Sequence, residues 1–165
     1  MDRLQLVAKL KVIALCKGES DSFFDAFVPI LHICNFKKGH RVINEGDSGR
    51  DMYFLIQGAV RILKKTLSRE EYTAAILKDE YGIFFGEVGL ISDDNRTASV
   101  VAETDCIMAE LRADEFAAFI EKYPEYGMKF LRELAISICQ KLKKSNHDTV
   151  VLYEALINEI GHNFL

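Results

Sequence analysis

The sequence predicts a mainly β protein bracketed by helices, and three observations point to that class. Seven of the ten glycines fall between residues 39 and 89, with short apolar or alternating runs between them. Both prolines, Pro29 and Pro124, lie outside that stretch. Helical periodicity precedes the stretch and returns after it. Short strands divided by glycine turns are typical of an antiparallel sandwich, barrel or jelly roll, where proline would remove ladder donors.

The length and composition suit one domain, or one domain with a helical appendage. The chain has 165 residues, 49% hydrophobic and 28% charged with mixed sign, so disorder is excluded as its main state. The net charge of −4 gives no global basic field of the kind that favours DNA or an anionic membrane. No run approaches the roughly 18 apolar residues of a membrane helix. We therefore expect a cytoplasmic protein with no DNA and no membrane partner.

Residues 1–31 form the first predicted part, a set of N-terminal helices. The first helix carries apolar residues at three- and four-residue steps along one face, Leu4, Val7, Leu10 and Ala14. Ser20 predicts the N-cap of a second helix, because its hydroxyl can accept from a free amide of the first turn. The buried side of that helix is predicted to be Phe23, Phe24, Phe27 and Ile30.

Residues 32–112 form the predicted β part. Seven short runs have the alternation or the apolar content of strands, namely 32–36, 41–44, 52–57, 59–65, 72–77, 97–103 and 106–111. A segment of different character, residues 85–100, follows the fifth of these runs and extends into the start of the sixth. It is the part of the β region that carries chemistry.

Residues 113–165 form the predicted C-terminal helices. Asp114 is predicted to cap a helix that ends at Tyr123-Pro124. A longer helix follows, with an apolar stripe of Phe130, Leu131, Leu134, Ile138 and Leu142. Residues 148–160 continue either as another helix or as an extension of the same one.

The segment 85–100, FGEVGLISDDNRTASV, carries the densest chemical signal. Gly86 allows a sharp turn out of a strand, and residues 87–91 can then form a helical turn whose free amides attract phosphate. A polar turn returns Arg96 beside these amides, and its planar fork matches two phosphate oxygens. Glu87, which can only accept, suits a sugar hydroxyl. The segment therefore predicts a site for a ligand with one phosphate and one hydroxyl.

The same residues allow a plainer interpretation. A glutamate and an arginine nine residues apart are more often a structural ion pair in a partly buried loop. Spacing alone leaves both interpretations open.

Residues 85–100 resemble the phosphate-binding cassette of cyclic nucleotide-binding domains. Such domains occur in cAMP-dependent kinase regulatory subunits, nucleotide-gated channels and catabolite-activator-type regulators. Further similar segments, 36–39, 42–47, 52–60 and 104–106, extend the resemblance over residues 20–145. The resemblance implies an antiparallel β-roll (jelly roll, double-stranded β-helix) with N-terminal helices and a C-terminal helix that serves as lid and dimerisation helix.

The resemblance also implies a ligand-binding set of Gly86, Glu87, Val88, Arg96, Thr97 and Ala98. Glu87 is expected to accept from the ribose 2′-hydroxyl, and Arg96 to pair with the cyclic phosphate beside the amides around Thr97 and Ala98. Two residues depart from the family pattern: Asn95 stands where proline is frequent, and Gly89 where alanine is common. Neither change removes a contact group. Three further glycines are expected to serve turns rather than the ligand, Gly46, Gly49 and Gly58.

Other chemistry finds little support in the sequence. The four histidines do not cluster, and no G-x-S-x-G motif occurs, so we expect no metal site, no cofactor and no catalytic residue. Only 54 residues follow Leu111, which leaves no room for a helix-turn-helix domain beyond the long helix.

We therefore expect a sensor without catalytic activity that binds cAMP and/or cGMP. The alternative is a degenerate member of the same fold that acts as a ligand-free protein-interaction module. A third hypothesis, an enzyme on a jelly roll, needs a metal site that the sequence lacks. The C-terminal apolar stripe is either core or a dimer seam. The resemblance favours a homodimer through this helix, and a sensor also implies an unidentified effector protein as partner.

Overall fold

The computed structural model describes residues 1–162, and their side chains through Glu159. The chain divides into two compact units, Met1–Met128 and Lys129–Leu165. The first unit holds both sheets, the short helices and the first residues of the long C-terminal helix, and the second holds the rest of that helix. Each unit is described below by itself.

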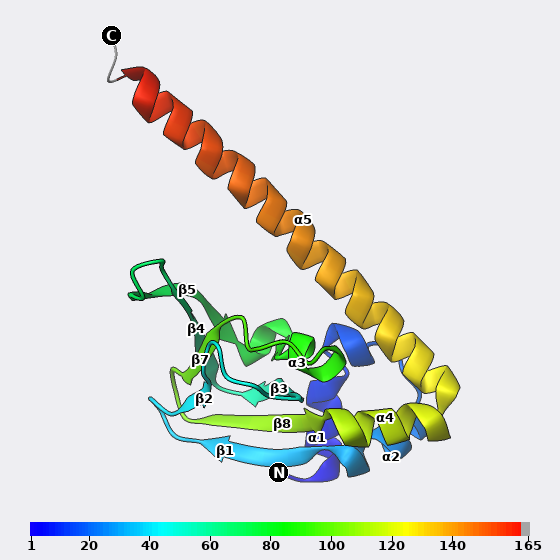
Figure 1. Cartoon of the computed structure of the whole chain (residues 1–165). Coiled ribbons are helices and arrows are strands. Elements are labelled where there is room, and N and C mark those ends of the chain that lie inside the picture. Colours follow the sequence, from blue (N-terminus) through cyan, green and yellow to red (C-terminus); the bar gives the residue numbers. More distant parts are fainter. Residues whose placement is uncertain (163–165) are drawn as a thin grey trace. The chain divides into compact units, whose positions relative to one another are not determined.

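Two four-stranded antiparallel sheets form the body of the first unit (Figure 1). The first sheet has the order β1 (His32–Phe36), β8 (Cys106–Arg112), β3 (Asp51–Gln57), β6 (Phe84–Phe85). The second has the order β2 (Arg41–Ile43), β7 (Ser99–Ala102), β4 (Ala59–Lys65), β5 (Glu71–Lys78). Since the chain passes back and forth between the sheets, the strands wind into a roll. The predicted fold class is confirmed.

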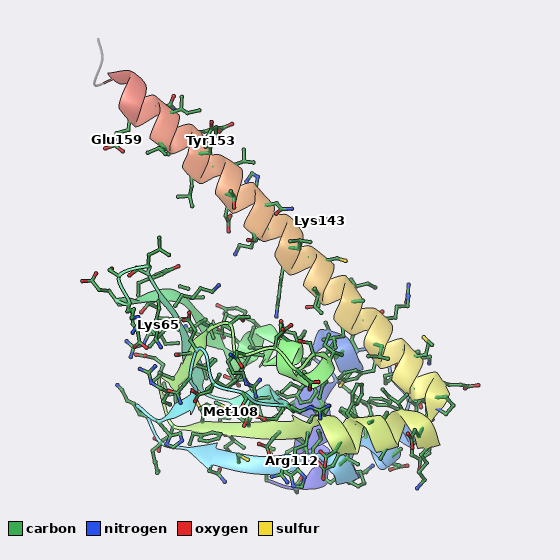
Figure 2. All side chains as sticks on the ribbon, viewed as in Figure 1. Lys65, Met108, Arg112, Lys143, Tyr153 and Glu159 are labelled. Carbon is green, nitrogen blue, oxygen red and sulfur yellow. The ribbon has the colours of Figure 1, made fainter. Side chains whose placement is uncertain are left out.

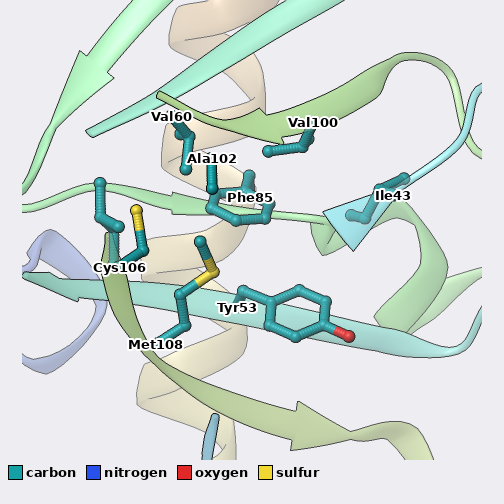
Figure 3. Packing of buried hydrophobic residues seen from close by; sticks show 9 residues of the cluster. Ile43, Tyr53, Val60, Phe85, Val100, Ala102, Cys106 and Met108 are labelled. Atoms are coloured by element: carbon teal, nitrogen blue, oxygen red, sulfur yellow. The ribbon is translucent and has the colours of Figure 1, made fainter. Parts of the chain in front are cut away.

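The core of the roll lies between the two sheets (Figure 3). Its buried members are Tyr53, Leu55, Phe85, Cys106 and Met108 from the first sheet, and Ile43, Val60, Val100 and Ala102 from the second. The ring of Tyr53 stacks on that of Phe85 with centroids 5.6 Å apart. This contact fixes Phe85, and the chain leaves the core at the next residue, Gly86.

Strand β6 is absent from the sequence prediction. Its two residues, Phe84 and Phe85, pair with Phe54 and Tyr53 of β3. Two residues are too few to show an alternation, so the pattern that revealed the other strands gave no signal here.

The N-terminal helices differ in part from the prediction. Helix α1 (Arg3–Leu10) is capped by Asp2, and it buries Leu6 and Leu10 while Leu4 is 77% exposed. The predicted face through Ala14 was therefore wrong, because the helix ends at Leu10 and a separate 3-10 turn, η1 (Ala14–Cys16), follows. Helix α2 (Asp21–Phe27) has the expected cap, since the Ser20 hydroxyl accepts from the Phe23 amide at 3.2 Å. Two further 3-10 turns are η2 (Val28–Ile30) and η3 (Asp79–Tyr81).

The C-terminal helices begin without the predicted cap. Helix α4 (Ala113–Lys122) follows β8 directly, so Arg112 occupies the N-cap and Asp114 lies in the first turn. Helix α5 (Pro124–His162) is one continuous helix of 39 residues, which settles the alternative left open for residues 148–160. No helix among the described residues is both long and apolar enough to cross a membrane.

The second unit is exposed along most of its length. Phe130 and Leu134 are each 1% exposed, whereas Leu142 is 59% exposed. Every described side chain from Cys139 to Glu159 is exposed, and Figure 2 shows Lys143, Tyr153 and Glu159 projecting from the helix. The predicted apolar stripe is thus buried at its start and exposed at its end.

Candidate ligand-binding site

The site begins where β6 turns into the short helix α3 (Glu87–Ile91). Gly86 occupies the N-cap with φ 84° and ψ 10°, a left-handed conformation that glycine adopts without strain. A Cβ at this position would lie 2.9 Å from the Asp51 carbonyl oxygen. The sharp turn predicted for Gly86 and the single turn of helix after it are both present.

The backbone of Arg96 is fixed by the loop between β2 and β3. The Arg96 amide donates to the Asp47 carbonyl at 2.9 Å, and the Gly46 amide donates to the Arg96 carbonyl at 2.8 Å. Gly46 itself has φ 92°, as a turn glycine requires. These two bonds set the direction in which the arginine side chain leaves the backbone.

The guanidinium of Arg96 is almost fully enclosed, with a side-chain exposure of 7%. Its Nη1 donates to the Asp51 carbonyl at 2.7 Å and to the Gly86 carbonyl at 3.3 Å. Its Nη2 lies 3.0 Å from Oδ2 of Asp51, so the two side chains form an ion pair. Arg96 therefore connects the cassette to the first residue of β3.

Two glycines make room for this guanidinium. A Cβ at Gly49 would lie 2.6 Å from both Nε and Nη2 of Arg96. A Cβ at Gly89 would lie 2.3 Å from the Gly49 carbonyl oxygen and 2.7 Å from Nη1 of Arg96. Gly49 is consequently needed for close packing on the arginine, a structural role beyond the turn that was expected for it. Gly89, which departs from the family pattern, is needed for the same reason.

The remaining predicted site residues lie along the same stretch of chain. Glu87 and Val88 are half-buried in the first turn of α3. Thr97 is exposed and Ala98 half-buried, and both follow Arg96 directly before β7 begins. The structure brings Gly86 and Arg96 into contact.

A polar hollow of about 180 Å³ lies beside Arg96. Its lining residues are Val42, Ile43, Asn44, Asp47, Ser48, Gly49, Asp51 and Arg96. Of the two carboxylates among them, Asp47 lies on the loop that fixes Arg96, and Asp51 is the first residue of β3.

Tyr53 connects the Asp51 end of the site to the first sheet. Its hydroxyl donates to Oε1 of Glu110 at 3.0 Å, and Glu110 in turn lies 3.0 Å from Nη2 of Arg112. Burial, followed by the Asp51 carboxylate, raises the pKa of Tyr53 well above its usual range. The phenol therefore stays neutral and remains a donor at physiological pH.

The sequence interpretation missed Asp51. Nothing in its spacing from Arg96 marks it, since 45 residues separate the two and only the turn at residues 46–50 brings them together. Gly49 offered a signal as a loop glycine, but the arginine that it packs against could not be identified from sequence. Among the described residues, no group of three or more His, Cys, Asp or Glu side chains is placed to hold a metal ion.

Fold and site together define a β-roll that carries a buried arginine within a glycine-rich cassette. The family model for the cyclic nucleotide-binding domain matches residues 33–123, which include the whole cassette. The chain belongs to this family.

Individual relatives agree with that assignment. The chain is 32% identical over 142 residues to potassium/sodium hyperpolarization-activated cyclic nucleotide-gated channel 2 of Mus musculus, a match that covers 86% of this chain and 15% of the channel. It is similar to the catabolite activator protein of Thermus thermophilus, with a TM-score of 0.75 and 25% identity over 84% of this chain and 62% of that one. The regulatory domain of Toxoplasma gondii PKA, solved with cAMP, shares the fold with a TM-score of 0.63 and 24% identity over 71% of this chain and 44% of that one. The chain thus spans only a small part of the curated channel that it matches.

Proposed function

We propose that this chain is a cyclic nucleotide sensor without catalytic activity, which binds cAMP and/or cGMP in the cassette. Arg96 carries this proposal. Hydrogen bonds hold its backbone amide and carbonyl, and its guanidinium is shielded from water, which suits it to a phosphate monoanion. The family assignment supports the same role. A ligand-free interaction module remains the outcome if neither nucleotide binds.

The other cassette residues complete the proposed contacts. Glu87 accepts from the ribose 2′-hydroxyl, and the segments Gly86–Val88 and Thr97–Ala98 line the ligand. The proposed output is a conformational signal to an effector protein. Such a signal requires the ligand to bind one conformation more tightly than another. A cytoplasmic location stays a prediction.

Calorimetric titration and thermal melting with cAMP and with cGMP test this proposal. At a hundredfold excess over the dissociation constant, bound ligand adds about 2.7 kcal/mol to the free energy of unfolding. We expect Arg96→Ala to lose at least about a hundredfold in affinity, since a charge-assisted, bidentate contact disappears. Arg96→Lys keeps the charge without the fork and should lose less.

Arg3→Ala is the matched control for these variants. The Arg3 side chain is 51% exposed and pairs with Asp25 of helix α2, so both residues lie outside the cassette. Its removal should leave nucleotide affinity within about twofold of wild type. Wild-type affinity in Arg96→Ala would contradict the proposed site, and no binding of either nucleotide to wild type would contradict the proposed function.

We also infer that the chain forms a homodimer through α5. Beyond residue 149 the helix exposes several large apolar side chains, by 49 to 71%: Val150, Val151, Leu152, Tyr153, Leu156 and Ile157. Leu142, Thr149 and Leu156 recur every seven residues with Leu152 between them, which is the spacing of a coiled-coil seam. Because Leu134 of the predicted stripe is buried within the chain, we place the seam beyond it.

Sedimentation over a range of concentrations tests the dimer. The double variant Leu152→Glu/Leu156→Glu should be monomeric where wild type is dimeric, since it buries like charges in the seam. Val151→Glu adds a charge on another side of the helix and should remain dimeric. A wild-type chain that stays monomeric at every concentration would rule the dimer out.

A further inference from the structure

The guanidinium proposed to hold the phosphate already has an anionic partner. Asp51 places Oδ2 3.0 Å from Nη2 of Arg96, and the carbonyl oxygen of the same residue accepts from Nη1 at 2.7 Å. One residue therefore contacts both terminal nitrogens of the arginine.

The loop before Asp51 closes the remaining edge. The backbone of Gly49 approaches the Nε and Nη2 atoms so closely that a Cβ there would lie 2.6 Å from each. Asp51 thus contacts Nη1 and Nη2, and Gly49 packs against Nε and Nη2. A phosphate that binds at Nη2 therefore meets the Asp51 carboxylate.

The charges of the Asp51 carboxylate and of a phosphate also oppose binding of both at Arg96. A carboxylate and a phosphate on a single guanidinium repel each other, and this repulsion is strong where little water screens it. The Arg96 side chain is 7% exposed and that of Asp51 25%. The two anions therefore compete for Nη2.

We propose that Asp51 is an internal competitor of the ligand: its carboxylate holds Arg96 in the unliganded chain, and the cyclic phosphate replaces it at Nη2. This inference rests on the proposed function and deepens it. Asp51 thereby sets the affinity of the sensor, keeping the site closed until the nucleotide concentration is high enough to displace it. It acts through Arg96 and does not itself contact the nucleotide.

Calorimetric titration of the full chain with cAMP and cGMP tests this role. Asp51→Asn keeps an oxygen that can accept from Nη2 but carries no charge. We expect it to bind the preferred nucleotide at least about tenfold more tightly than wild type. Asp25→Asn is the matched control, because Asp25 also pairs with an arginine, Arg3, on the N-terminal helices. That variant should bind as wild type does.

The outcomes separate the two proposals. If wild type binds nucleotide and Asp51→Asn binds equally or more weakly, Asp51 orients Arg96 rather than competing for it, and the inference fails while the proposed function stands. If neither wild type nor Asp51→Asn binds either nucleotide, the proposed function fails. If Asp51→Asn alone binds, the competing role of Asp51 is supported, whereas the proposed function fails for the wild-type chain.

A structure of the wild-type complex with the nucleotide that binds gives a second test that does not depend on the variant folding. The distance between Nη2 of Arg96 and Oδ2 of Asp51 should rise from 3.0 Å to more than about 4 Å, beyond the range of an ion pair. A contact retained at its present length beside a bound phosphate would overturn the proposed exchange.

Discussion

Two arginine–carboxylate pairs in the roll have opposite character. Arg41 on β2 donates to both oxygens of Glu71 on β5, at 2.8 and 2.9 Å, and both side chains are about a third exposed. Nη2 of Arg96 contacts the Asp51 carboxylate, and its Nη1 donates to two backbone carbonyls. The arginine side chain is almost fully buried.

The two pairs show that good pairing geometry and a large contribution to stability need not go together. The Arg41–Glu71 pair has the better fork geometry, but water can replace either partner, so such pairs contribute little. In the Arg96–Asp51 pair, loss of the guanidinium would leave two carbonyls and a carboxylate without their donor in a site with little water. Burial rather than pairing geometry decides which of the two matters.

The largest expected effect comes from removing the buried guanidinium. Arg96→Ala should lower the free energy of unfolding by about 2 to 4 kcal/mol, the cost of leaving buried acceptors and part of a charge unpaired. Urea unfolding without ligand measures it. Arg41→Ala, the matched change at the exposed pair, should have nearly the wild-type free energy of unfolding. Equal losses in the two variants would show that burial does not distinguish the two pairs.

A smaller loss is expected from filling the space beside the buried pair. Gly89→Ala puts a Cβ 2.3 Å from the Gly49 carbonyl oxygen, so the loop or the helix must shift, at about 1 to 3 kcal/mol. Ile91→Ala in the same helix is the control, because Ile91 is 51% exposed. If Gly89→Ala unfolds at the wild-type urea concentration, the packing of the two glycines does not constrain the arginine.

The smallest expected effect concerns pH at the exposed pairs. Hydrogen bonds from Arg41 lower the pKa of Glu71, and those from Lys37 and the Lys38 amide lower the pKa of Asp105. A lowered pKa in the folded state means that the stabilisation is present above the unfolded pKa and is lost as pH falls through the folded one. Glu71→Gln and Asp105→Asn should therefore be slightly less stable than wild type at pH 7.

Thermal melts at pH 7 and pH 3 check this expectation. The difference between each variant and wild type should shrink at pH 3, where the wild-type carboxylates become protonated. A difference in melting temperature that grows on acidification would contradict the lowered pKa values of Glu71 and Asp105.

The sequence predicted correctly those features that depend on residues close together in the chain. The Ser20 cap, the Gly86 turn and the strands with clear alternation depend on residues a few positions apart, and these features appeared as expected. Asp114 failed as a cap because β8 continues without a break into α4, which local propensity does not reveal. Asp51 and Gly49 failed to stand out because their partner lies far along the sequence and is brought near only by the fold.

The pairing of β1 with β8 has a consequence for synthesis on the ribosome. The first strand of the roll takes its neighbour from the last, with His32 opposite Glu110 and Phe36 opposite Cys106. A nascent chain cannot close this sheet until residue 112 has left the exit tunnel, and contacts between such distant segments form slowly. Until then, the apolar strands of the roll are exposed together in an unfinished chain, a state in which exposed apolar surface and unpaired strand edges favour aggregation.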